Sequence, residues 1–181
     1  MRMMKGNLIT LEPLDVNKHA KGYFNVSQDP KIHKYTGNTV PKSIDEIVAL
    51  LKKYEKYFYN WMIISNESLA VIGIIRLGKP EMENGMLVAG ESQFLLSECW
   101  RKGYMKEAKR LFYQYVFDEL SVEKLYADVW NGNINSIKSL EFYGYKLIET
   151  RKERFSKTGK YTIKYIYSLS KNDYLCSLKK E

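Results

Sequence analysis

The sequence predicts a single α/β domain, residues 1–181, in which helices flank a mixed sheet of about seven strands. The first observation behind this prediction is the order of the expected elements: strand, helices, three strands, helix, strand, helix, two strands. A doubly wound nucleotide-binding fold would alternate strands and helices strictly, so this order argues against one. The second observation is length, because 181 residues bury one good core whereas two domains would each have a small one. The third is that no linker-like change of composition and no internal repeat divides the chain.

The chain begins with a strand and a helix. Residues 8–14 alternate between apolar and polar side chains, which predicts a short strand ended by Pro13. Asp15 is a typical N-cap and predicts a helix that runs to about Val26. The Asp-Pro pair at 29–30 then predicts a new helical turn.

The next helix has a strong start signal. Ser43 is an expected N-cap, and Glu46, three residues later, is the partner of a capping box. Apolar residues then repeat at the spacing of one helix face: Ile44, Ile47, Val48, Leu51 and Tyr54.

A hairpin and a long strand follow. Residues 61–64 and 69–77 are rich in β-branched and apolar residues and are joined by a polar turn. Gly73, inside the second strand, indicates a bulge or a close approach of backbones. Residues 86–96 predict the fourth strand, which is the longest.

The second half of the chain repeats helices and strands. A helix is expected to begin at Asn135 or Ser136 and to end before Gly144, which suits the left-handed C′ position. The remaining expected elements are a helix at 107–120, strands at 125–130, 145–150 and 161–169, and a short helix at 172–178.

The turn between the fourth strand and its following helix, residues 100–108, is the most informative stretch. Gly103 lets an anion approach the backbone, and the first turn of a helix offers unpaired N–H groups at the positive end of its dipole. Arg101, Lys102 and Lys106 add positive charge. The local sequence therefore predicts either a phosphate cradle or a plain helix start with a solvated basic face.

Composition limits the partners. Twenty-nine basic against 21 acidic residues give a net charge of +8, which favours anionic ligands, but the lysines are spread evenly and no groove-reading helix is evident. Nucleic acid is therefore not the expected partner. Cys99 and Cys176 are isolated and there are only two histidines, so no metal site is predicted. No apolar signal core and no run of 18 apolar residues occurs, which predicts a cytoplasmic protein without a membrane partner.

The element order and the turn at 100–108 together resemble the acetyl-CoA-dependent N-acetyltransferase (GNAT) superfamily. Its pyrophosphate turn reads Q/R-x-x-G-x-G/A; here Gly103 matches the first glycine, Trp100 stands at the Q/R position and Met105 replaces the last small residue. The whole stretch fits the string aromatic-x-K-G-[YI]-x-x-E-A of the ribosomal-protein N-terminal acetyltransferases (the RimJ/RimL-like branch). Residues 133–136 and 141–145 follow that branch's N-x-x-S and E-x-x-G-[FY] arrangement.

The resemblance implies a mostly antiparallel sheet whose fourth and fifth strands part to admit acetyl-CoA. The pantetheine arm would pair with backbone groups of Phe94, Leu95 and Leu96, whose side chains can at the same time belong to a plain core strand. Asn133 would contact the same arm, or serve only as a turn residue. The pyrophosphate would lie on the turn residues, namely Arg101, Lys102, Gly103, Tyr104, Met105 and Lys106.

The implied chemistry is direct attack of a primary amine on the thioester, without a covalent enzyme intermediate. Many family members have an acid tyrosine where this chain has Leu140. Ser136 is the candidate that donates to the departing thiolate, and its alternative role is the N-cap of its helix. Glu91 is the candidate base, acting through water, and its alternative is a strand carboxylate that faces solvent or pairs with a lysine.

The predicted function is thus acetyl transfer from acetyl-CoA to a protein N-terminus or a small-molecule amine. The alternative is a catalytically silent domain that binds acyl-CoA as a sensor or regulator, which the departures at Met105 and Leu140 keep open. Either a monomer or a homodimer suits the fold.

Overall fold

The computed structural model describes residues 1–37 and 39–179. Contacts within the chain group these residues into two compact units. The first unit contains residues 1–34, 39–79 and 91–120, and the second contains residues 35–37, 80–90 and the chain from 121 onward. Each unit is therefore assembled from segments that are distant in sequence.

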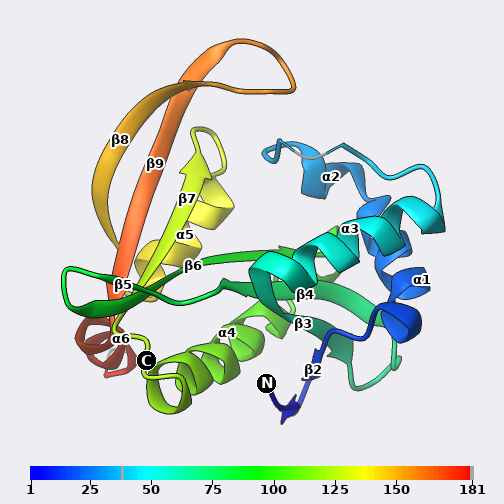
Figure 1. Ribbon diagram of the computed structural model, residues 1–181, viewed down its shortest axis with the longest axis horizontal. Helices are drawn as coiled ribbons and strands as arrows, with labels where there is room; N and C mark the ends of the chain where they lie inside the picture. Colours follow the sequence, from blue (N-terminus) through cyan, green and yellow to red (C-terminus); the bar gives the residue numbers. More distant parts are fainter. Residues whose placement is uncertain (38, 180–181) are drawn as a thin grey trace. The chain divides into compact units, whose positions relative to one another are not determined.

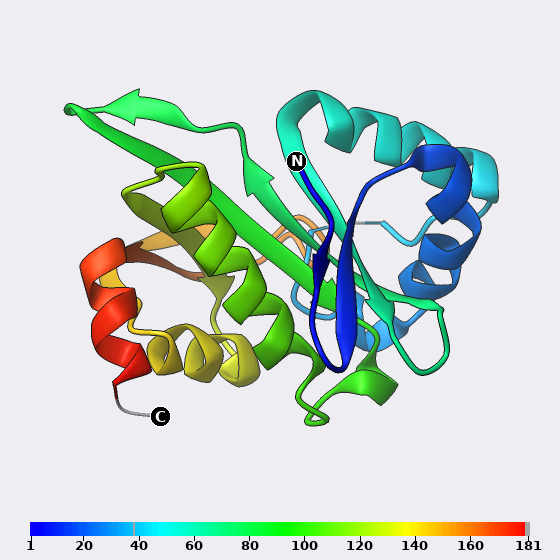
Figure 2. The same ribbon diagram turned by 90° about the horizontal axis from the view of Figure 1, so that it is seen from below.

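The first unit contains an antiparallel sheet in which each strand pairs with the next. In spatial order, its strands are β1 (Met4–Lys5), β2 (Ile9–Pro13), β3 (Phe58–Ser65), β4 (Val71–Gly78) and the second half of β6 (Met86–Leu95). Figure 2 shows β1 beside β2 near the N-terminus. All these strands except β1 were predicted, with ends within three residues of those observed.

Gly73 of β4 confirms the prediction of a close backbone approach. A Cβ atom at this position would lie 2.3 Å from the carbonyl oxygen of Phe94 on the neighbouring strand. The pairing of β3 with β4 also shifts register between Ile63 and Ile64, opposite this glycine, which is the predicted irregularity.

Three helices of the first unit begin at the caps that the sequence predicts, and the fourth begins at Tyr104, three residues before its predicted start at 107. The helical elements of this unit are α1 (Val16–Ser27), α2 (Pro30–His33), α3 (Ile44–Tyr57), a 3₁₀ turn (Ser97–Cys99), α4 (Tyr104–Gln114) and a π-helical turn (Tyr115–Glu119). Asp15, Asp29 and Ser43 each accept a backbone N–H as N-cap. The capping box differs in one bond, because the Glu46 carboxylate accepts from the N–H of Lys42 at 2.8 Å and not from that of Ser43.

The core of the first unit lies on both faces of its sheet. On one face α1 and α3 lie side by side (Figure 1) and bury Tyr23 and Leu51 against Met62 and Ile74 of the strands. On the other face the ring of Trp61 packs edge-on against Phe112 of α4, with 5.8 Å between ring centroids. Burial of such large apolar side chains is the main source of stability.

The second unit holds the remaining strands. They are β5 (Glu81–Glu83), the first half of β6, β7 (Lys124–Trp130), β9 (Tyr161–Ser170) and β8 (Lys146–Arg154). Strand β5 pairs with β6, and β7, β9 and β8 pair antiparallel in that order. The pair β6–β7 is parallel and covers three residue pairs, from Val88 with Lys124 to Gly90 with Tyr126. Beyond Gly90, β6 pairs with β4. Beyond Tyr126, β7 pairs with β9.

Two helices complete the second unit, α5 (Ile134–Phe142) and α6 (Lys171–Leu178), both visible in Figure 2. The predicted start of α5 was wrong by one or two residues, because Asn133 and neither Asn135 nor Ser136 forms the N-cap. Gly144 has φ +88° and follows the C-cap, as predicted.

The described residues therefore form a mixed α/β fold with nine strands, mostly antiparallel, flanked by helices. The two strands beyond the predicted seven are β1 and β5, which have two and three residues and lack a recognisable pattern. Within the described part of the chain, every helix is too short or too polar to cross a membrane.

Candidate functional site

The turn before α4 has the backbone geometry of an anion-binding site. Gly103 is the N-cap of α4 with φ +85°, and Arg101 also has a positive φ of 62°. The N–H groups of Tyr104 and Met105 have no acceptor within their own helix, because they belong to its first turn. The side chains of Arg101, Lys102 and Lys106 are exposed around this turn. This geometry is compatible with both predicted alternatives, a phosphate cradle and a helix start with a solvated basic face.

A carboxylate in the first turn of α4 fastens this turn to the start of β2. The Glu107 side chain accepts three backbone N–H groups, from Asn7 at 2.8 Å, Leu8 at 2.7 Å and Ile9 at 2.9 Å. Three donors offset the negative charge of Glu107, which would otherwise oppose an anion at the same helix end. No local pattern in the sequence indicates this role of Glu107, because its partners are about a hundred residues away.

Strand β6 has one edge that pairs with β4 and one edge that, beside residues 91–95, pairs with no strand among the described residues. Hydrogen-bonded and non-bonded positions alternate along an antiparallel pair. The N–H of Leu96 donates to Ile72 of the β4 segment at 2.8 Å, so Phe94 also faces β4, whereas Gln93 and Leu95 direct their N–H and C=O groups to the unpaired edge.

This alternation distinguishes the backbone groups expected to bind pantetheine that are already used within the chain from those that are available. Leu95 offers its N–H at the unpaired edge, but its carbonyl already accepts from the indole Nε1 of Trp100 at 2.8 Å. Both backbone groups of Leu96 are occupied, because its carbonyl accepts from Cys99. The backbone groups of Phe94 face β4, whereas those of Gln93, which was not among the predicted contacts, face the unpaired edge.

Glu91 lies in the interior on the face covered by α4. None of its side-chain surface is exposed, and its Oε1 accepts from Tyr113 at 3.0 Å and lies 3.5 Å from Lys109, which is also fully buried. Burial lowers the pKa of Lys109, and the Glu91 carboxylate opposes this shift. Of the two alternatives for Glu91, this burial favours the carboxylate paired with a lysine over a base that reaches an acceptor amine. The other oxygen, Oε2, has no hydrogen-bond partner among the described residues.

In the second unit, Asn133 takes the N-cap role that was the alternative expected of Ser136. Asn133 is the N-cap of α5, and its Oδ1 accepts the backbone N–H of Ser136 at 3.4 Å. Ser136 is therefore not the cap, and its hydroxyl forms no hydrogen bond within the described residues. The amide nitrogen of Asn133 and the hydroxyl of Ser136 both remain available for a ligand. Leu140, at the family's tyrosine position, is buried.

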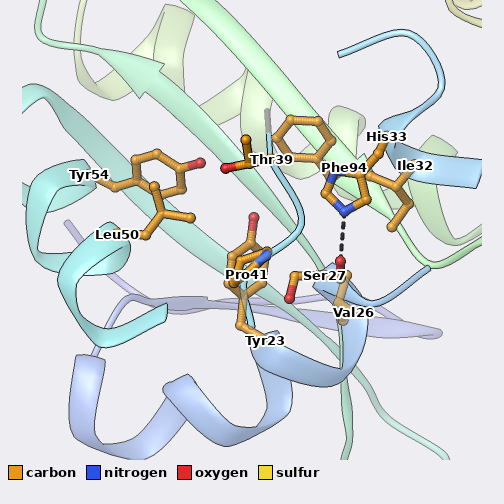
Figure 3. Close-up of a pocket in the computed structure, with 10 residues that line it drawn as sticks. All are labelled: Tyr23, Val26, Ser27, Ile32, His33, Thr39, Pro41, Leu50, Tyr54 and Phe94. Atoms are coloured by element: carbon orange, nitrogen blue, oxygen red, sulfur yellow. Dashed lines mark hydrogen bonds between the residues drawn. The ribbon is translucent and has the colours of Figure 1, made fainter. Parts of the chain in front are cut away.

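A pocket opens in the first unit between α1, α2, α3 and β6 (Figure 3). It measures about 350 Å³, counting space open to solvent. Its lining is mostly apolar and hydroxyl-bearing: Tyr23, Val26, Ser27, Ile32, His33, Thr39, Pro41, Leu50, Tyr54 and Phe94. His33 Nε2 lies 2.6 Å from the carbonyl oxygen of Ser27, so this nitrogen carries the proton and donates.

The site contains no recognisable metal position: among residues 1–37 and 39–179, no three His, Cys, Asp or Glu side chains lie close enough together to hold an ion.

Known proteins resemble this chain along most of its length. The model of the acetyltransferase (GNAT) domain matches residues 9–146, well over half of the chain. The probable N-acetyltransferase YjcK of Bacillus subtilis (strain 168) is 28% identical over 154 residues, which are 79% of this chain and 83% of that protein.

Solved structures share the fold. A GCN5-related N-acetyltransferase from Brucella melitensis superposes with a TM-score of 0.85 at 23% identity, covering 98% of this chain and 82% of that one. A ribosomal-protein-S5-alanine acetyltransferase from Vibrio fischeri superposes with a TM-score of 0.77 at 13% identity, covering 96% and 99%.

Proposed function

The chain belongs to the GNAT acetyltransferase family, and we propose that it transfers an acetyl group from acetyl-CoA to a primary amine. In this reaction a C–N bond to the acetyl carbon forms and the C–S bond of the thioester breaks. The amine loses a proton, and the CoA sulfur leaves as a thiolate or, once protonated, as a thiol. The protein has to bind the donor, hold the amine near the carbonyl, and help these charges to move.

The observation that carries the proposal is the pair formed by the α4 turn and the unpaired edge of β6, both in the first unit. The turn offers N–H groups and positive charge to a pyrophosphate, around a glycine with φ +85°. The edge offers the backbone groups of Gln93 and the N–H of Leu95 to the amides of a pantetheine arm, as an added strand would use them. A CoA thioester needs both kinds of group, and acetyl-CoA is the donor that the family implies.

Ser136 is the proposed donor to the departing thiolate. The support is that its hydroxyl is not used to cap α5, since Asn133 has that role. Asn133 keeps its amide nitrogen for the proposed contact to pantetheine. The buried position of Glu91 supports a water molecule, and not this carboxylate, as the immediate acceptor of the amine proton.

We further propose that residues 1–181 form one N-acetyltransferase domain of the RimJ/RimL-like branch. The strings at 100–108, 133–136 and 141–145 support this assignment, and the Vibrio fischeri enzyme shares the fold. A protein N-terminus and a small-molecule amine are the two acceptor classes to be compared. Nucleic acid is not a proposed partner.

The decisive experiment has two stages. Isothermal titration first measures binding of acetyl-CoA, with ATP as a control ligand that also carries a pyrophosphate. A screen of small amines and N-terminal peptides with mass detection then seeks the acetylated product. Binding with product supports the transferase; binding without any product supports the silent acyl-CoA sensor; absence of binding removes both.

A further inference from the structure

Arg76 of β4 is a buried cation without an acidic partner. Only 7% of its surface is exposed, and its Nε donates to the Ser92 hydroxyl at 3.0 Å. No Asp or Glu of the described chain forms an ion pair with it. Its direct neighbours across the sheet, Asn60 and Ser92, are neutral. Burial of an unpaired charge is costly, so such a residue indicates a missing anion.

Aromatic rings surround the guanidinium but do not neutralise it. The carbon Cζ lies 4.2 Å from the ring centroid of Tyr54, 5.1 Å from that of Phe94 and 5.2 Å from that of Phe58. Such faces attract a cation and fix its plane. Burial raises the pKa of the nearby Tyr23, so its phenol stays protonated and carries no charge.

The guanidinium still has donors to offer. Neither Nη atom donates a hydrogen bond to a group of the described chain. Neither of them is completely buried, so both keep contact with solvent. Two parallel N–H groups of an arginine match the two oxygens of a carboxylate, and such bidentate pairs are among the strongest side-chain interactions.

Arg76 is not itself a lining residue of the pocket in Figure 3, but it contacts two residues that form the pocket wall. Tyr54 and Phe94, whose rings it contacts, both line the pocket, and so does Tyr23. None of the described lining residues is a carboxylate, so the pocket offers no negative charge to a second ammonium group. Its apolar side chains suit an uncharged, compact body.

From these observations we propose that the acceptor is a small amine that also carries a carboxylate, an amino acid or a close analogue. Its carboxylate binds the Arg76 fork, and its apolar side chain occupies the pocket between α1, α2 and α3. This inference rests on the proposed acetyl transfer, and it adds the substrate class. Polyamines and neutral amines lack the group that Arg76 would bind.

The test compares matched acceptors. Leucine and phenylalanine are assayed against leucinamide and phenylalaninamide, which differ only in lacking the carboxylate. An amino-acid amide has a more weakly basic amine than the amino acid, so the two acceptors differ in kcat/KM even without any effect of Arg76. The informative quantity is therefore kcat/KM for the acid divided by kcat/KM for the amide (the acid-to-amide ratio), compared between the wild type and each variant. Arg76→Gln removes the charge, Arg76→Lys keeps the charge without the fork, and Lys52→Gln, an exposed position on α3, controls for net charge.

The expected result is that Arg76→Gln lowers the acid-to-amide ratio roughly 10- to 100-fold, as loss of a charged hydrogen-bonded pair should. Arg76→Lys lowers the ratio less, Lys52→Gln leaves it unchanged, and acetyl-CoA affinity stays the same in all three variants. Equal ratios in the wild type and Arg76→Gln overturn the inference, as does a wild type that acetylates amines in the wider screen but not these amino acids.

If neither Arg76 variant folds, titration of the wild type with leucine and with leucinamide decides the question. Tighter binding of leucine supports the inference, and equal binding overturns it. Failure of the wild type to bind acetyl-CoA would instead remove the proposed function, so the two failures are distinguishable.

Discussion

The carboxylate of Glu107 accepts the backbone N–H of Leu8 at 2.7 Å, across 99 positions of sequence. The adjacent amides of Asn7 and Ile9 donate to the same carboxylate, and a Cβ on Gly6 would lie only 2.4 Å from it. The start of β2 is therefore held tightly against the first turn of α4. This attachment fixes the turn that we propose as the pyrophosphate site.

Replacement of Glu107 by Gln tests this attachment. The amide keeps one acceptor oxygen but directs its own N–H groups at backbone donors, so the free energy of unfolding should fall by about 1–3 kcal/mol. Acetyl-CoA affinity should fall as the turn loosens, while the KM for the amine stays close to that of the wild type. Urea unfolding and isothermal titration measure the two effects. Glu98→Gln, at an exposed residue just before the turn, makes the same charge change and should alter neither quantity.

Gly103→Ala should weaken acetyl-CoA binding and stability together. Its φ of +85° disfavours any side chain, and a Cβ would lie 3.3 Å from Leu8 Cδ1. We expect a loss of about 1–2 kcal/mol in the free energy of unfolding. Gly103→Asp should reduce the affinity further, because it adds a negative charge at the anion site.

Gly85→Ala is the matched control. Gly85 has φ +80° with nothing within 4 Å, so the Gly85→Ala protein should lose stability without losing acetyl-CoA affinity. Unchanged binding by folded Gly103 variants would contradict the cradle.

The buried pair of Glu91 and Lys109 should behave as one unit. Lys109→Met leaves a buried carboxylate without its cation and should cost about 3–5 kcal/mol. The double substitution Glu91→Leu with Lys109→Met removes both charges, so it should cost less than the single one. A double-mutant cycle by urea unfolding measures this coupling, and additive losses would show that the pair is not coupled.

The chemistry of Ser136 can be separated from helix capping. Asn133→Ala removes the N-cap of α5 and should lower the free energy of unfolding by about 1 kcal/mol. Ser136→Ala removes only the hydroxyl, so stability should stay within about 0.5 kcal/mol. Its kcat should nevertheless fall roughly 100-fold if the hydroxyl donates to the leaving thiolate. Ser139→Ala on the same helix is the control, and equal kcat values for the two serine variants would remove Ser136 from the mechanism.

His19 should make folding sensitive to mild acid. Its Nδ1 accepts the N–H of Asp15 at 3.0 Å, and burial lowers its pKa despite the Glu12 carboxylate 3.7 Å from Nε2. As the pH falls, the imidazole of His19 therefore binds a proton in the unfolded state, with a pKa near 6.5, at a higher pH than in the folded state. Stability is complete above that value and falls as the pH drops below it, by up to about 1.4 kcal/mol per pH unit. His19→Asn keeps an acceptor for Asp15 and cannot titrate, so urea unfolding between pH 7.5 and 5.5 should give a shallower slope. Equal slopes of the free energy of unfolding against pH in the wild type and His19→Asn would show that His19 does not cause this sensitivity.

Local signals in the sequence predicted most of the fold. Asp15, Asp29 and Ser43 cap the helices that follow them, because a cap acts on backbone groups two or three residues away. The signal failed at α5, where Asn133, Asn135 and Ser136 are all acceptable caps and only the path of the chain selects one. The two shortest strands, β1 and β5, were missed because two or three residues carry no periodicity.

By itself, the sequence determined the order of the elements, the glycine turn before α4 and the resemblance that implies a CoA thioester. These features depend on neighbouring residues, whose geometry the backbone sets locally. Tertiary structure alone decided that Glu91 is buried against Lys109, that Gln93 and Leu95 face the unpaired edge, and that Arg76 lies among three rings without a carboxylate. Each of these depends on groups brought together from distant segments, and a one-residue change of register or face would reverse it.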